Sequence, residues 1–211
     1  ASSNINNLKN KNSNEYISVF LANENKPYFV AVQNHTGIIF KNFGLGTVQR
    51  ESGAVYYGKN AKDNVKYLNI TARTWNGGYL SFAKNFFDNH LSFGFTGKFL
   101  EKKEVDLSLT ESEILKIPPS KSFKEYVKEK EKRGHALGAD LGFILLLHKE
   151  TNTKFGVAVQ NIGMNYDWNT SKGTNGPSAD PHISNAGFTT SFGTKKNQIK
   201  IFAEYKDILN R

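Results

Sequence analysis

The chain of 211 residues is long enough for one domain or two small ones, and although only 38% of it is hydrophobic, an aromatic content of 13% argues against disorder. It contains no Cys, which excludes disulfide scaffolds, thiolate metal sites and cysteine nucleophiles. Its net charge of +9 leaves nucleic acid and anionic lipid head groups open as partners, and charge alone does not choose between them.

The N-terminal part of the chain predicts a flexible start followed by strands. Residues 1–14 are rich in Asn and Lys and low in apolar content, so we expect a flexible tract there. Residues 15–211 are then expected to form a single domain. Tyr28 to Gln33 and Ile38 to Val48 predict its first strands, although their alternation is less regular than that of later segments.

Glycines interrupt two of the predicted strands. A strand expected from Leu68 to Ala83 contains Gly77-Gly78, where we expect a β-bulge. Gly44 and Gly46 lie within the strand pattern before it. They predict either a bulge or a close approach of another backbone segment.

The clearest signal is two-residue alternation in the rest of the chain. Successive side chains of a strand point to opposite faces of a sheet, so apolar residues at every second position predict a strand with one apolar face. Such alternation predicts an all-β chain with strands at Leu91 to Phe99, Leu137 to Leu147, Phe155 to Gln160, Ala186 to Phe192, and Ile199 to Tyr205.

Connections of two lengths alternate along the chain. Those at Asn85 to His90, Lys149 to Thr153 and Gly193 to Asn197 are short, whereas Glu101 to Gly134 and Met164 to Pro181 are long. In an antiparallel meander this places the short turns at one end and the long loops at the other, which is the layout of an outer-membrane β-barrel with periplasmic turns. The best of these predicted strands, such as Leu91 to Phe99 and Leu137 to Leu147, are close to the ~9–11 residues that cross a bilayer when tilted.

The long segment from Lys102 to Arg133 predicts a helical insertion in water. It carries 16 charged side chains in 32 positions. Thr110 to Glu113 and Ser122 to Glu125 each have the capping-box pattern that opens a helix, and Pro118-Pro119 separates them. We therefore expect a structured external loop that acts as a lid or as a docking surface for a protein partner.

In a transmembrane barrel, alternation assigns each residue to the lumen or to lipid. Polar residues that alternate with apolar ones are candidates for the lumen, where opposite charges can pair or can set the polarity of a solute path. The lumen-lining candidates are Arg73, Lys98, Asp140, Lys200 and Glu204. The lipid-facing candidates are Leu91, Phe93, Phe95, Leu141, Phe143, Phe155, Val157 and Ile201.

Other chemistry has little support in the sequence. The five His residues are scattered without i, i+4 spacing, and Asp167 to Ser171 lacks the Gly and Glu of a calcium loop. Neither a G-x-S-x-G nor a P-loop pattern occurs. The aromatic rings alternate with apolar residues on strand faces instead of forming a stacking surface for bases. We therefore expect no catalytic or metal site, no cofactor and no nucleic-acid partner.

Several predicted strand sequences resemble those of the outer-membrane barrels related to the long-chain fatty-acid transporters (FadL-like), particularly the TraF-like and PorV-like branches. The resemblance covers roughly residues 28–209 and is carried by the segments beginning at Tyr79, Leu91, Gly138, Lys154 and Ile201, which read YLSFAK, LSFGFTGKFL, GADLGF, KFGVAVQNIG and IFAEYKDIL. It implies a barrel in the outer membrane of a Gram-negative-type bacterium. Members of that superfamily are longer and carry a lumen plug, and none is apparent before Glu15. We therefore expect either part of a larger barrel or about eight strands that close on themselves.

The function predicted from these features is that of a non-enzymatic membrane barrel. It would be a channel or transporter for small or apolar solutes, or an assembly partner, with outer-membrane lipid around it and an apolar small molecule as a candidate ligand. The alternative is a soluble two-sheet β-sandwich that serves as a surface binding module, because its strands would show the same alternation.

Overall fold

The computed structural model describes residues 24–59, 65–118, 120–167, 176–193 and 198–206. The predicted N-terminal tract 1–14 lies outside these residues, as do most of the Asp167 to Ser171 loop and of the turn after Gly193. The strands are β1 (Tyr28–Ile39), β2 (Phe43–Lys59), β3 (Lys66–Phe86), β4 (Leu91–Thr110), β5 (Lys132–His148), β6 (Thr153–Ile162), β7 (Ile183–Gly193) and β8 (Gln198–Tyr205).

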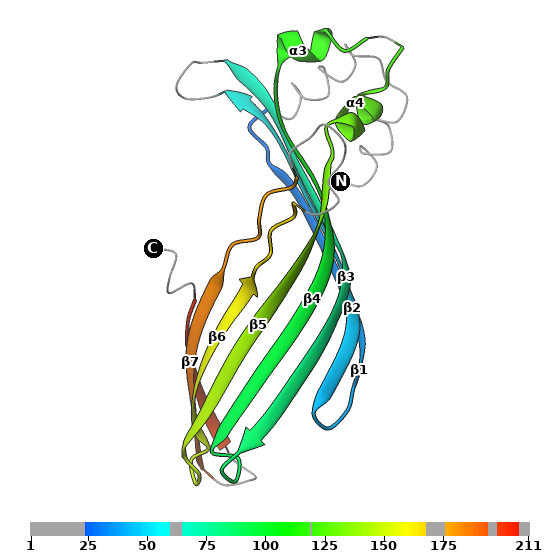
Figure 1. The fold of residues 1–211 in the computed structure, drawn as a ribbon. Coiled ribbons are helices and arrows are strands. Elements are labelled where there is room, and N and C mark those ends of the chain that lie inside the picture. Colours follow the sequence, from blue (N-terminus) through cyan, green and yellow to red (C-terminus); the bar gives the residue numbers. More distant parts are fainter. Residues whose placement is uncertain (1–23, 60–64, 119, 168–175, 194–197, 207–211) are drawn as a thin grey trace.

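The eight strands form one antiparallel sheet in sequence order, which confirms the predicted all-β meander. The sheet curls into a half-barrel (Figure 1). β1 and β8 lie at its two edges, and among the described residues each pairs with one neighbouring strand only. No helix in the described part of the chain is long and apolar enough to span a bilayer.

The central strands are longer than the sequence predicted. β3 has 21 residues and β4 has 20, and they pair from Tyr67–Thr110 to Phe86–Leu91 without a register shift. At a rise of about 3.3 Å per residue, each is roughly twice as long as a tilted membrane strand needs to be. The upper halves of β2 to β5 therefore extend above the half-barrel and carry the two helices (Figure 1).

The glycines of β2 and β3 mark close approaches, and the bulge expected at Gly77-Gly78 is absent. The register of β3 with both neighbours is continuous through these residues. A Cβ atom on Gly77 would lie 2.1 Å from the carbonyl oxygen of Phe99, and one on Gly46 would lie 2.6 Å from the hydroxyl oxygen of Tyr79. Glycine is required at both positions because a side chain would collide with β4 or with the tyrosine ring.

The structure contains the predicted helical insertion, but the insertion is shorter than the predicted range from Lys102 to Arg133. β4 continues to Thr110 and β5 begins at Lys132, so only residues 111–131 connect them. The connection contains α3 (Glu111–Leu115) and α4 (Phe123–Glu129). Both predicted capping boxes are confirmed, at Thr110 with Glu113 and at Ser122 with Glu125.

Above the half-barrel, the helices cover one face of the sheet. Tyr57, Leu68, Leu109 and Ile114 form a buried cluster there, with Phe123 and other apolar side chains packed around it. The Tyr57 hydroxyl donates a hydrogen bond to Glu111, and burial together with this carboxylate raises the pKa of the phenol. A small head with its own apolar core thus stands on the half-barrel.

Candidate solute trough and the ion cluster above it

Cross-strand register sorts the side chains of the half-barrel onto two faces, because residues that are directly opposite in an antiparallel pair point to the same side. Phe93 is opposite Phe143, and Phe95 is opposite Leu141. The same rows continue through the other strands. All eight predicted lipid-facing residues therefore share one face, which we call the outer face: Leu91, Phe93, Phe95, Leu141, Phe143, Phe155, Val157 and Ile201.

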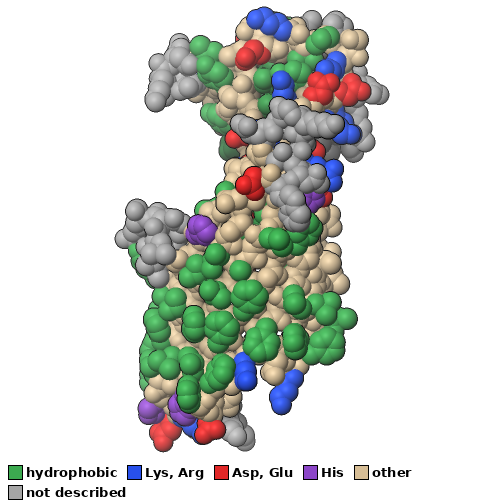
Figure 2. Space-filling model, in the orientation of Figure 1, with side chains coloured by type: hydrophobic (Ala, Val, Ile, Leu, Met, Phe, Trp, Pro, Cys, Tyr) green, Lys and Arg blue, Asp and Glu red, His purple; other side chains and the backbone are tan. Residues whose placement is uncertain are grey.

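The outer face carries a band of large apolar side chains (Figure 2). Phe93 packs beside Phe143, with ring centroids 5.1 Å apart, while Phe95 is 42% and Phe143 48% exposed. On β4 the band runs from Leu91 to Phe99. Above it the outer face becomes charged at Glu101, which pairs with Arg133 and Lys103 of the same face. Charged residues again occupy the lower rim (Figure 2).

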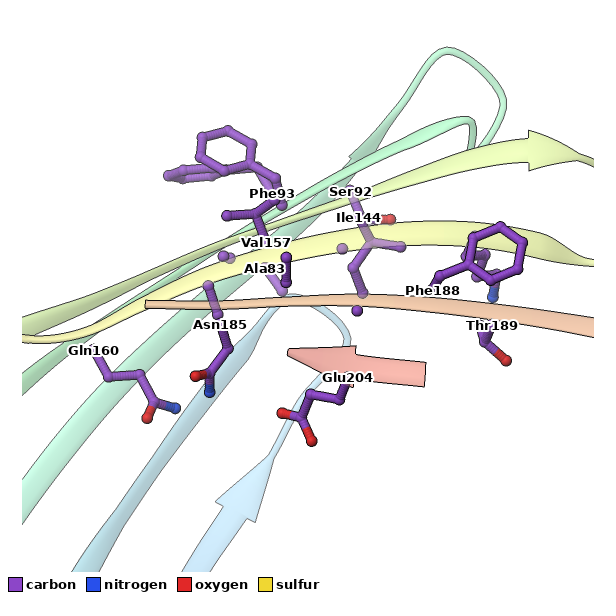
Figure 3. A pocket seen from close by; sticks show the side chains of 18 of the residues that line it. Ala83, Ser92, Phe93, Ile144, Val157, Gln160, Asn185, Phe188, Thr189 and Glu204 are labelled. Atoms are coloured by element: carbon purple, nitrogen blue, oxygen red, sulfur yellow. The ribbon is translucent and has the colours of Figure 1, made fainter. Parts of the chain in front are cut away.

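The opposite, inner face is lined by small residues. Ala83, Gly94, Gly142 and Ala158 are successive cross-strand neighbours, and Gly156 lies opposite Gly187 in the adjoining row. They form the floor of an open cavity of about 520 Å³, which we call the trough. Figure 3 shows Gln160, Asn185 and Glu204 on the trough side of the sheet and Phe93 on the other side. The volume lies within the ~300–1,000 Å³ typical of small-molecule sites.

Two of the predicted lumen residues meet on this inner face, above the trough. Lys98 Nζ lies 2.6 Å from Asp140 Oδ1 and donates to Asn161 Oδ1 at 3.0 Å. Asp140 also accepts a hydrogen bond from the backbone N–H of Asn161, at 2.9 Å. Asn161 has a positive φ of 61° next to an irregularity in the β5–β6 register, so these contacts hold an unusual backbone turn. No pattern in the sequence predicts this role for Asn161.

The remaining lumen candidates are separate from this pair. Arg73 lies higher on β3, and its Nε donates to Glu104 Oε1 at 2.9 Å. Lys200 is exposed on β8, the edge strand. Glu204 borders the trough and lies 3.4 Å from Lys206. The five residues thus share the inner face but do not converge on one point.

Above the trough, a buried ion cluster attaches the β6–β7 connection to the inner face. Lys102 is only 2% exposed. Its Nζ donates to Asp180 Oδ1 at 3.0 Å and to the carbonyl oxygen of Ser178 at 2.8 Å. It also lies 5.3 Å from the ring centroid of Trp75 and 5.1 Å from that of Tyr166, which is within cation–π range.

Asp180 is the centre of this ion cluster. Its Oδ2 accepts hydrogen bonds from Trp75 Nε1 at 3.1 Å and from the Tyr166 hydroxyl at 2.7 Å. Burial and the adjacent Asp180 carboxylate raise the pKa of Tyr166, so its hydroxyl stays protonated and acts as a donor. The described ends of the connection, residues 163–167 and 176–182, are therefore fixed by charged and aromatic contacts instead of by strand pairing.

Glu104 forms a second attachment between the β6–β7 connection and the inner face. It accepts hydrogen bonds from the Ser178 backbone N–H at 2.6 Å and from Ser178 Oγ at 2.9 Å. Burial alone would raise the pKa of Glu104, but the two Ser178 hydrogen bonds, together with Lys102 and Arg73, lower it below its usual value of 4.5. Glu104 lies five residues above Phe99, outside the apolar band.

The lowered pKa of Glu104 predicts that the β6–β7 connection detaches from the inner face of the sheet at acid pH. A carboxyl whose pKa is lower in the folded state stabilises that state above pH ~4.5, and this contribution is lost as pH falls through the folded-state pKa. We expect the hydrogen-exchange protection factors of residues 176–182, which correct for the intrinsic slowing of exchange in acid, to fall below pH ~4.5 in the native chain, and Glu104→Gln to weaken this pH dependence. An unchanged pH profile in the variant would show that Glu104 is not the titrating group.

The sequence did not predict this cluster. The density of charge predicts that Lys102 and Glu104 lie in a solvated loop, whereas both are buried on β4 with partners. Trp75 is 105 residues away from Asp180 in the chain. The alternation of Val105, Leu107 and Leu109 with Asp106 and Ser108 was the available sign that the strand goes on.

The described residues contain no group of three or more His, Asp or Glu side chains placed to hold a metal ion. Comparisons with family models, curated proteins and solved structures found no match to this chain. Its geometry alone therefore indicates what the half-barrel can do. It offers an apolar outer surface, a trough with a floor of small residues, and an ion cluster at the upper end of the trough.

Proposed function

We propose that this chain forms the wall of an outer-membrane β-barrel in a Gram-negative-type bacterium and acts as a channel or transporter for small or apolar solutes. The observation that carries the proposal is the division of one sheet into two chemically different faces. Leu91 to Phe99 present large apolar side chains outward, while the cross-strand row through Gly94 and Gly142 leaves open space inward.

The outer face has the chemistry expected of a membrane-facing wall. Its apolar band on β4 has about the height that a tilted strand needs to cross the hydrocarbon layer, and charged residues begin on both sides of it. In water, such a large area of exposed phenylalanine and leucine would be a liability for aggregation. A membrane removes that cost because the side chains meet hydrocarbon.

The chemistry of the inner face favours a path for solutes over a catalytic site. The trough floor contributes few polar groups, and the polar side chains at its margin include Gln160, Asn185 and Glu204. Higher up, Lys98 and Asp140 neutralise each other. A path with an apolar floor and a few polar margins suits a small or apolar solute better than a strongly charged one.

Detergent dependence and heat modifiability test the membrane location. We expect the purified chain to require detergent, to float with lipid vesicles, and to migrate faster on a gel before heating than after it, as folded outer-membrane barrels do. The competing proposal is a soluble β-sandwich module. It would be monodisperse without detergent and would not bind vesicles, and that result would overturn the membrane proposal.

Conductance through the trough tests the transport role. Two glycines, one on each face of the sheet, provide the sites for a test substitution and its control. A Cβ atom on Gly142 meets no atom closer than 3.9 Å, so Gly142→Phe should fit and project into the trough. Gly97 lies on the outer face, where a Cβ also has room. We expect planar-bilayer current for the parent chain, a several-fold smaller current for Gly142→Phe, and no change for Gly97→Phe. Absence of current in the parent would show a closed lumen and favour a role as an assembly partner.

A further inference from the structure

Within the described residues, β1 at the first edge of the sheet shows none of the usual protection against pairing. β1 is twelve residues long, pairs with β2 in continuous register, and is exposed throughout. It contains no Lys, Arg, Asp, Glu or Pro. Sheet edges that face water normally carry such residues or bulges because an open edge is a template for another strand. β1 is therefore suited to pair with a further strand along the edge that does not pair with β2.

The second edge is exposed in a similar way. β8 pairs with β7 through Gln198 to Tyr205. On its inner face Phe202 is 67% exposed, and on the inner face of β1 Phe29 is 75% and Ile39 is 88% exposed. Large apolar side chains thus occur on the inner face at both edges, whereas the middle of that face is mostly small residues, with Ile144 as a large apolar exception. The apolar side chains at both edges are of the kind that other strands normally cover.

Closure of the eight strands on themselves does not suit this inner face. β1 and β8 lie on opposite sides of the half-barrel (Figure 1). An eight-stranded barrel has an interior just wide enough for side chains to fill. Here the trough floor is built from residues such as Gly94, Gly142 and Gly187, which supply no side chains to fill it. The curvature and the small residues together indicate half of a wider barrel.

We propose that a second copy of this chain completes the barrel by pairing its β8 with β1 of the first copy and its β1 with β8. The inference rests on the proposed membrane location. With an even number of strands, β1 runs from the head toward the lower rim and β8 runs back toward the head. A copy rotated about the barrel axis keeps the same orientation in the membrane and brings β8 antiparallel to β1, as a barrel requires.

A two-fold axis along the barrel makes both seams equivalent and closes the assembly at two copies. Pairing of β1 with β1 would instead turn one copy upside down, which would place its head on the wrong side of the membrane. The solute path depends on the second copy, because the trough is open on the side that the partner would cover. The partner would thus contribute the other half of the lumen wall.

Disulfide trapping in membranes tests this arrangement, and the absence of Cys in the chain leaves no background. Asn34 lies on the outer face of β1 and Ala203 on the outer face of β8. Two differently tagged chains, one with Asn34→Cys and one with Ala203→Cys, are co-expressed and oxidised. Val32→Cys and Thr36→Cys replace Asn34→Cys in parallel samples so that neighbouring registers are covered.

We expect a covalent heterodimer with at least one of the three β1 positions. His35→Cys is the matched control, since its side chain is on the inner face and should not reach Ala203→Cys. In a single chain with both substitutions, a disulfide within that chain would show eight-strand closure and would overturn the proposal. Absence of any disulfide in membrane-embedded protein would also overturn it, because other strands would then cover the edges. Vesicle flotation of the parent chain separately reports whether the membrane location itself holds.

Discussion

Phe95→Arg is expected to destabilise the membrane-inserted protein by about 2–4 kcal/mol, the cost measured for a cation on the lipid face of a barrel near the bilayer midplane. Phe95 lies midway along the apolar band of β4 and is 42% exposed on the outer face. A guanidinium there would have to enter hydrocarbon or pull water and head groups toward it. The free energy of unfolding in lipid vesicles, followed by tryptophan fluorescence in a urea titration, gives the value.

The adjacent residue provides the control for this experiment. Thr96 is on the inner face, directly opposite Asp140, and its hydroxyl lies 2.9 Å from Ser81 Oγ. Arginine at this position would face the aqueous interior next to a carboxylate, so we expect Thr96→Arg to cost much less than Phe95→Arg. Equal costs at the two positions, or a larger cost at Thr96, would contradict the assignment of the outer face to lipid.

Removal of Asp180 is expected to have the second large effect. Asp180→Ala leaves the buried Lys102 ammonium without its carboxylate and removes the acceptor used by Trp75 and Tyr166. Loss of one partner of a buried ion pair costs about 3–5 kcal/mol, since the other charge stays desolvated. We expect the free energy of unfolding to fall by an amount in this range, unless residues 176–182 detach first and hydrate Lys102. Rapid hydrogen exchange of that segment would then report the same loss.

Two further variants separate the ion pair from general effects of substitution. Lys102→Met combined with Asp180→Leu removes both charges, so we expect it to recover most of the stability that Asp180→Ala loses. Lys200→Ala removes an exposed cation on β8 and should change the free energy by less than about 0.5 kcal/mol. If the double variant were as unstable as Asp180→Ala, the hydrogen bonds of Trp75 and Tyr166, not the buried charge, would be the source of the loss.

The sequence by itself determined the local features of this protein. Alternation located the strands and assigned Phe93, Phe95 and Phe143 to a common face, because the side-chain period of a strand is fixed by backbone geometry. The capping boxes at Thr110 and Ser122 correctly predicted α3 and α4, since each is a contact between residues three positions apart. Alternating connection lengths predicted the antiparallel order of the strands.

Only the tertiary structure decided the features that depend on residues far apart in the chain. The Lys102–Asp180 pair, and with it the extension of β4 to Thr110, arises because the β6–β7 connection brings partners to a buried lysine that composition alone placed in water. The continuous register through Gly77-Gly78 depends on how closely β4 approaches. The open edges at β1 and β8 depend on the curvature of the whole sheet, which is a sum of twists and packing contacts over eight strands that no local pattern encodes.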